Sequence, residues 1–118
     1  MRTTLPITIA LAVVAVSLTS SAQAKDSGLK GEVYPSFKIE FEKDGKDAKT
    51  VKAGRYSIKI EDQSKIHNFR LRGPGVNRAT TVPFVGERTW RITLKPGTYT
   101  YLCDPHRSSM RGTFTVVA

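Results

Sequence analysis

The residues of this chain that can bind a metal are few, and three of them lie close together near its C-terminal end. Cys103, His106 and Met110 fall within eight residues, and the only other histidine, His67, lies far upstream. One thiolate, two imidazoles and a thioether suit copper better than zinc or iron, because soft sulfur favours Cu(I) and imidazole accepts either oxidation state. Two histidines and a cysteine in one plane, with a distant axial methionine, form the ligand set of blue copper. These four residues are therefore the candidate ligands of one copper ion.

The small number of cysteines and histidines also excludes several other kinds of site. A single cysteine rules out an internal disulfide framework, a CxxC redox pair and a cysteine-rich zinc module. Two histidines bound to one copper leave none for a trinuclear oxidase cluster or for a second, substrate-binding copper. We therefore expect no enzymatic activity from this chain alone.

Each candidate ligand also has an ordinary structural interpretation. A lone cysteine in a strand is often a small buried hydrophobic residue. His67 fits a hydrogen-bonded residue at a strand end, and Met110 fits a side chain that fills the end of a core. Their joint occurrence favours the metal site, because the chain has no other cysteine or histidine.

The elements that must position these side chains follow a hydrophobic period of two, which predicts strands. Short apolar alternations, most of them bounded by Gly, Pro, Asn or Asp, occur around residues 37–42, 56–61, 69–72, 90–94, 99–103 and 114–116. No capped pattern of helical period follows residue 24. Short half-buried strands at this spacing predict an all-β fold, a Greek-key antiparallel β-sandwich.

Three short segments predict how the strands are joined. Residues 43–46, with Asp-Gly at the centre, are typical of a hairpin turn. Residues 73–75 (Gly-Pro-Gly) break any strand and predict a sharp loop. Residues 94–99 match the L-x-P-G-x-Y pattern of a tyrosine corner, so Tyr99 is predicted to be structural, with its hydroxyl bonded to upstream backbone.

The same patterns predict how the ligands meet. Cys103 is in phase with Tyr99 and Tyr101, so its sulfur is expected to point inward at the end of a core strand. Pro105 fixes its own backbone and restricts the residue before it, so the chain can turn and return His106 over the same end. His67 must arrive from a different strand, which makes the site a link across the sandwich.

With these residues in place, the chain resembles a cupredoxin of the plastocyanin, pseudoazurin and amicyanin sort, over essentially all of residues 25–118. The upstream histidine is followed by Asn68, as is common in that family, and the resemblance implies that Asn68 ties the two ligand loops together and supports the thiolate. The Cys103-x-x-His106 spacing matches the short-loop members. The gap from His106 to Met110 differs from plastocyanin-like and amicyanin-like sequences by one residue. The resemblance further implies that His106 lies at the surface and passes electrons.

The N-terminal residues predict export. Arg2 precedes an apolar stretch over 5–18, and Ala22-Gln23-Ala24 forms a small-x-small cleavage site, the pattern of a secretory signal peptide. We expect residues 1–24 to be the signal peptide and 25–118 the copper-binding domain. The product is predicted to be periplasmic or secreted, without stable membrane insertion, and a monomer.

Charge indicates the kind of partner. The chain has 19 Lys and Arg against 10 Asp and Glu, a net charge of +9. A group of arginines close in sequence to the candidate ligands predicts a positive surface that steers an acidic redox partner protein to the copper: Arg70, Arg72, Arg78, Arg107 and Arg111. Nucleic acid is not an expected partner, because no nucleic-acid motif is present.

Three functions are compatible with these observations. The first is a carrier that moves electrons one at a time between redox partners. The second is periplasmic copper binding or delivery without a dedicated electron-transfer role, which predicts an exchangeable Cu(I) site. The third is a metal-free extracellular sandwich for adhesion or scaffolding, which predicts no visible absorption and no stabilisation by copper.

Overall fold

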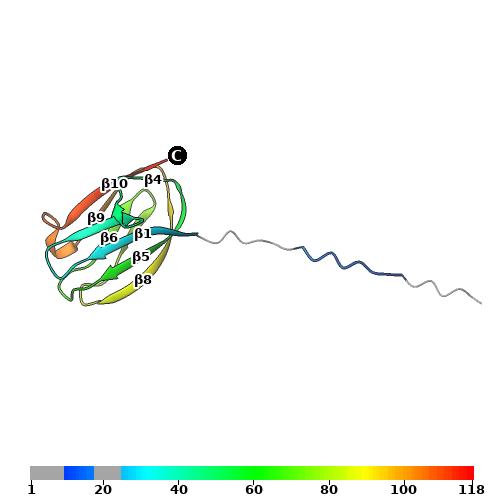
Figure 1. Ribbon diagram of the computed structural model, residues 1–118, viewed down its shortest axis with the longest axis horizontal. Helices are drawn as coiled ribbons and strands as arrows, with labels where there is room; N and C mark the ends of the chain where they lie inside the picture. Colours follow the sequence, from blue (N-terminus) through cyan, green and yellow to red (C-terminus); the bar gives the residue numbers. More distant parts are fainter. Residues whose placement is uncertain (1–9, 18–24) are drawn as a thin grey trace, which may run out of the picture.

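The computed structural model describes residues 10–17 and 25–118, and more than half of the second range belongs to strands (Figure 1). Most of the expected signal peptide and its cleavage site lie outside the described residues, so the cleavage stays a prediction. The described residues contain no helix that is long and apolar enough to span a membrane.

Two five-stranded sheets pack face to face to form a sandwich, as predicted. The first sheet has the order β3-β2-β1-β5-β8 and the second the order β4-β10-β9-β6-β7. The strands are β1 (Lys25–Val33), β2 (Ile39–Lys43), β3 (Lys46–Asp47), β4 (Thr50–Lys52), β5 (Gly54–Asp62), β6 (Arg70–Gly73), β7 (Val76–Ala79), β8 (Gly86–Leu94), β9 (Gly97–Leu102) and β10 (Arg111–Val117). A 3₁₀ turn, η1 (Asp104–His106), follows β9.

The sheets are mixed, whereas the sequence predicted antiparallel pairing throughout. β1 runs parallel to β5 and β4 runs parallel to β10, while the other pairs are antiparallel. A parallel pair needs a crossover connection, and here the chain leaves the first sheet after β3, adds β4 to the second sheet and returns as β5. Hydrophobic alternation reports which face of a strand is buried, but it does not report strand direction.

The core lies between the two sheets and is built from the inward residues of the alternating strands. Phe69 stacks on Tyr101, and Phe41 stacks on Phe114, so aromatic rings from both sheets fill the centre. Offset aromatic pairs of this kind add stability beyond the area that they bury. One part of the predicted alternation is wrong. Phe37 was expected to share the buried face with Ile39 and Phe41, but β2 begins at Ile39, and Phe37 lies before it with 64% of its surface exposed.

Both predicted turns are confirmed. Asp44 and Gly45 have positive φ values of 52° and 77° in the β2–β3 hairpin, a conformation that suits Asp-Gly. Pro74 and Gly75 join β6 to β7, whose residues pair from Arg70 with Ala79 to Gly73 with Val76. The second turn thereby keeps β6 and β7 together at one edge of the second sheet.

The tyrosine corner is also confirmed, and it fixes the start of β9. The Tyr99 hydroxyl accepts a hydrogen bond from the Lys95 N–H (3.0 Å) and donates one to the Pro74 carbonyl (2.9 Å). The ring of Tyr99 is fully buried. One side chain therefore joins the β8–β9 turn to the β6–β7 turn, at the opposite end of β9 from Cys103.

Substitution of Tyr99 by phenylalanine should destabilise the fold without changing its packing. The Pro74 carbonyl and the Lys95 N–H would each lose their partner, which costs about 1–3 kcal/mol of unfolding free energy. Urea unfolding of the copper-free protein measures this loss. Tyr56→Phe is the matched control, because the Tyr56 hydroxyl binds the Lys52 carbonyl in an exposed position, and an equal loss in both variants would contradict the role of the corner.

Candidate metal centre

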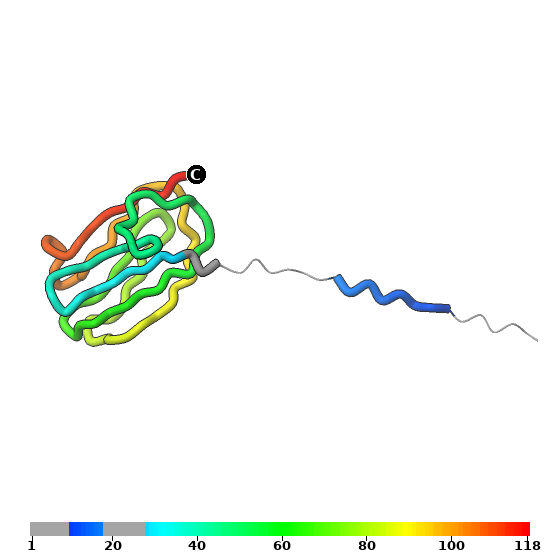
Figure 2. Tube along the Cα trace, viewed as in Figure 1, coloured from blue at the N-terminus to red at the C-terminus, as the bar shows by residue number. Residues whose placement is uncertain are grey.

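Cys103 follows the last residue of β9 and points into the core, as the strand phase predicted. Tyr99, Tyr101 and Cys103 are all buried on the same face. Cys103 keeps an extended backbone (φ −98°, ψ 122°) and donates its N–H to the Met110 carbonyl (3.0 Å). The thiol is therefore fixed at the end of β9. Figure 2 shows the chain turning between β9 and β10 at one end of the sandwich.

The segment after Cys103 turns back on itself and presents His106 to the same place. Pro105 lies in the first turn of η1, where its fixed φ is compatible with helical geometry. The His106 N–H donates to the Cys103 carbonyl (3.1 Å), and the Met110 N–H donates to the His106 carbonyl (2.8 Å). As a result, Nδ1 of His106 lies 3.6 Å from Sγ of Cys103.

His67 reaches this group from the connection between β5 and β6. Its side chain is fully buried, and its Nδ1 lies 3.7 Å from Sγ of Cys103 and 3.0 Å from Nδ1 of His106. It stands three residues before β6, in a loop rather than in a strand. The structure thus brings together His67, Cys103 and His106, although His67 lies 36 residues before Cys103 and 39 before His106.

The spacing of the three donor atoms fits one metal ion. Ligands that each lie about 2.0–2.3 Å from a shared first-row ion are separated from one another by roughly 3–4 Å. The three separations here are 3.0, 3.6 and 3.7 Å. A thiolate with two imidazoles is the planar donor set of a type 1 copper site, so the residues present fit a single copper ion.

Met110 is connected to this group through its backbone. Its N–H and carbonyl bind the His106 carbonyl and the Cys103 N–H, which closes the loop at both ends. Its side chain is fully buried within the core cluster. Met110 lies one residue before β10, at the end of the sandwich that also carries Cys103.

Burial also sets the protonation of the ligands. It raises the pKa of the Cys103 thiol, and the backbone N–H groups of Asn68 and His106 act in the opposite direction. Burial, and then the neighbouring His106, lower the pKa of His67, which keeps that imidazole neutral. Metal binding therefore finds a neutral nitrogen but must displace a proton from the thiol.

Asn68 links the two segments that carry the ligands, as the resemblance implied. Its Oδ1 accepts the Asp104 N–H (2.7 Å), and its Nδ2 donates to the Asp104 carboxylate (2.8 Å) and to the Thr80 carbonyl (3.1 Å). Its side chain is almost fully buried. The side chain next to His67 therefore holds the residue next to Cys103, which fixes the separation of the two ligands.

The arginines closest to the site are partly neutralised, which modifies the predicted positive surface. Arg70 donates twice to the Asp104 carboxylate (2.8 and 3.0 Å) and also to Asn77. Arg107 approaches the same carboxylate at 3.6 Å. The hydrogen bond from Arg70 lowers the pKa of Asp104, and the hydrogen bond from Asn68 lowers it further by a smaller amount. Two of the five arginines thus stabilise the loop instead of standing free for a partner.

The sequence did not predict Phe37 as part of the site. Its ring meets the His67 ring at 5.3 Å and the His106 ring at 4.9 Å, in edge-on geometry, while most of it stays exposed. The β1–β2 connection that carries it is closed by the Tyr34 N–H bound to the Lys38 carbonyl (3.1 Å). Alternation with Ile39 and Phe41 had suggested an inward residue, and no sequence signal marked the earlier strand end.

Comparison with known proteins gives a family and a fold. A family model described as a cupredoxin-like domain matches residues 8–116. No curated protein matches the chain at a significant level.

Several solved structures share this fold. One is a mutant of rusticyanin, a protein that the name of another solved structure calls a copper protein. It superposes on this chain with a TM-score of 0.56 at 21% identity, over 75% of this chain and 76% of that one. Reduced rusticyanin gives 0.55 at 21% identity over 87% of both chains. An oxidized mutant of amicyanin gives 0.53 at 17% identity, over 80% of this chain and 87% of that one.

Removal of the Asn68 side chain should loosen the metal centre. Asn68→Ala leaves the Asp104 N–H and the Thr80 carbonyl without partners, so we expect a loss of about 2–3 kcal/mol of unfolding free energy and faster release of copper to a chelator. Asn77→Ala is the control, because Asn77 is exposed and makes one hydrogen bond to Arg70. Equal copper release from both variants would contradict the linking role.

A second prediction concerns Asp62, the last residue of β5. Its carboxyl group is almost fully buried; Oδ1 accepts the Ser64 N–H (2.9 Å), whereas Oδ2 has no partner. Burial raises the pKa of Asp62 to about 6. Because the unfolded value is about 3.9, the folded chain binds a proton more tightly, and this contribution to stability is present below about pH 4 and is lost as the pH rises through the folded value.

The free energy of unfolding should therefore contain a component that falls by about 1–2 kcal/mol between about pH 4 and pH 7. Asp62→Asn should abolish that component, measured by urea unfolding of the copper-free protein across the range. Asp47→Asn, which removes an exposed carboxylate, is the control. If wild type and Asp62→Asn keep the same pH dependence, the buried carboxyl does not titrate as described.

Proposed function

Because this chain belongs to the cupredoxin-like domain family and is a copper protein, we propose that it carries electrons one at a time between redox partners. The observation that carries the proposal is the convergence of one buried thiol and two imidazole nitrogens within 3.0–3.7 Å. When bound, copper supplies a one-electron couple between Cu(I) and Cu(II). The side chains of the protein would hold that ion and shield it from water.

Four side chains would hold the copper ion. His67 and His106 would bind it through Nδ1, Cys103 through Sγ and Met110 through its thioether. The buried position of Met110 and its backbone bonds to the loop support this assignment. A donor set on a closed loop and a separately anchored histidine resists rearrangement, which favours rapid gain and loss of an electron.

Among the four, His106 is the route for electrons. His67, Cys103 and Met110 are fully buried, whereas His106 is only partly buried. Phe37 covers the two imidazoles from outside with an apolar ring. The chain thereby limits water at the ligands and leaves one ligand edge within reach of a partner.

Redox forms of the relatives support the proposal. Rusticyanin has been described in a reduced state and amicyanin in an oxidized state. The 118 residues hold no further histidine or cysteine for a second centre. With all four positions filled by protein, no open position is left for a substrate, and the chain acts as a carrier and not as an enzyme.

The proposal includes export and an acidic partner. The pattern over residues 1–24 supports cleavage after Ala24 and a periplasmic or secreted product. The net charge of +9 supports a redox partner protein with an acidic surface, whose approach long-range attraction would accelerate. Arg111, an exposed residue that directly follows Met110, contributes to that attraction.

The test begins with the visible spectrum of residues 25–118 after addition of Cu(II). We expect an intense blue band from the thiolate–copper bond, absent in Cys103→Ala and retained in Ser108→Ala, an exposed residue of the same loop. Copper should also raise the melting temperature, because it binds the folded state preferentially. If the protein binds neither Cu(II) nor Cu(I), the proposed function fails and only the assignment of the fold stands.

Two further measurements separate electron transfer from copper delivery. A carrier should give a reversible one-electron wave in voltammetry and should exchange its copper slowly with a Cu(I) chelator. A colourless protein that binds Cu(I) and releases it quickly would instead identify a copper delivery protein. Met110→Leu should keep the blue band and shift the reduction potential if the thioether is the axial ligand.

A further inference from the structure

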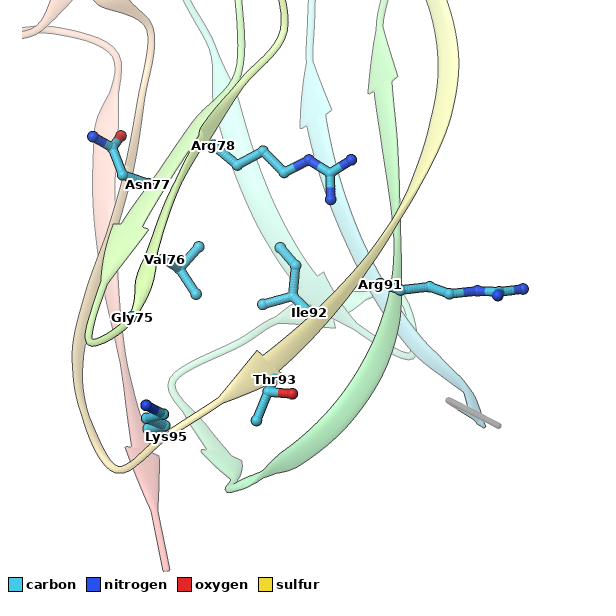
Figure 3. A pocket seen from close by; sticks show the side chains of 8 residues that line it. All are labelled: Gly75, Val76, Asn77, Arg78, Arg91, Ile92, Thr93 and Lys95. Atoms are coloured by element: carbon cyan, nitrogen blue, oxygen red, sulfur yellow. The ribbon is translucent and has the colours of Figure 1, made fainter. Parts of the chain in front are cut away.

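One hollow among the described residues lies outside the ligand group, at one open edge of the sandwich. It is a groove of about 430 Å³ between β7 and β8 (Figure 3). We call this hollow the edge groove. It is lined by Gly75, Val76, Asn77, Arg78, Arg91, Ile92, Thr93 and Lys95. None of the four candidate copper ligands belongs to this lining, although Asn77 accepts a hydrogen bond from Arg70.

Both strands that border the edge groove are edge strands. Among the described strands, β7 pairs only with β6 and β8 only with β5, so each leaves one row of backbone N–H and C=O groups without a strand neighbour there. β8 is nine residues long and contains no proline. The opposite edge is formed by β3 and β4, of two and three residues. A long unpaired edge strand is a template for an added extended segment.

The edge groove has cationic walls and an apolar floor. Ile92 and Val76 pack against the core and form the floor. Figure 3 shows Arg78 reaching across the groove above Ile92, while Arg91 extends outward from β8. The third cation, Lys95, lies beside Gly75.

These cations have no acidic partner in the groove. The lining contains no Asp or Glu, and none of the ion pairs among the described residues involves Arg78, Arg91 or Lys95. Arg78 is held by the Trp90 ring, 5.2 Å from its centroid, rather than by a carboxylate. Close to the copper ligands, in contrast, Arg70 and Arg107 share Asp104.

We propose that the edge groove binds an extended acidic segment of a partner protein by strand addition. Carboxylates on one face of such a segment would meet the unpaired cations, and apolar side chains on the other face would meet Val76 and Ile92, since successive side chains of a strand alternate. The same cations disfavour a second copy of this chain, because two such edges would repel each other.

The position of the groove leaves the copper end free. Lys95 lies beside the start of β9, and Cys103 follows the end of β9. The six residues of this strand therefore separate the Lys95 end of the groove from the thiol by about 20 Å. A partner held at the edge groove can therefore still approach His106 with another surface. The lining contains none of the candidate copper ligands, so binding there does not require electron transfer.

The experiment uses the folded protein, with and without copper, and a synthetic peptide of about eight residues that alternates glutamate and valine. We expect amide shifts in NMR titration at residues 75–78 and 91–95, with little change over 104–110. A peptide that alternates lysine and valine should not bind. Higher salt should weaken binding of the acidic peptide, because the contacts are partly ionic.

Lys95→Gln should weaken peptide binding several-fold, and Arg78→Gln with Lys95→Gln should weaken it by about tenfold or more. Lys65→Gln, an exposed change elsewhere, should leave it unaltered. If the double variant does not fold, the single variant and the salt dependence carry the test. Shifts confined to 104–110, equal binding of polyphosphate, or a dimer of this chain through β8 in sedimentation would each overturn the proposal.

Discussion

The closure of the segment between Cys103 and Met110 is the constraint on which the metal centre depends. Two backbone hydrogen bonds join Met110 to Cys103 and to His106, so the sulfur and one imidazole are held on a short loop. The second imidazole belongs to a separate connection, and Asn68 bridges the two through Asp104. The donor separations of 3.0–3.7 Å go with these bonds.

The distribution of charge differs between the copper end of the sandwich and its open edge at β7 and β8. Close to the ligands, Asp104 takes up Arg70 and Arg107, which fixes the loop but reduces the free positive charge there. Phe37 adds an exposed apolar ring at the same place. Free cations gather instead at the open edge between β7 and β8, where no carboxylate of the lining opposes them. An acidic partner would therefore meet more unopposed charge at the edge than beside the copper ligands.

Much of the fold could be predicted because its signals are local. Alternation with period two depends only on which face of a strand is buried, and the Asp44-Gly45 turn and the Tyr99 corner are short patterns with a direct geometric reason. The parallel pairing of β1 with β5 is different, since it arises from the excursion of β4 into the other sheet. That excursion depends on contacts between segments distant in the chain, and no local pattern encodes it.

By itself, the sequence determined the donor types, because a chain with one cysteine and two histidines allows few metal sites. It also determined that Cys103 points inward, through the strand phase that it shares with Tyr99 and Tyr101. Only the tertiary structure decided how Phe37 covers both imidazoles, how Asp104 neutralises Arg70, and where unpaired cations form a groove. The physical reason is that these contacts join side chains from separate connections, and their distances are set by packing of the two sheets rather than by spacing along the chain.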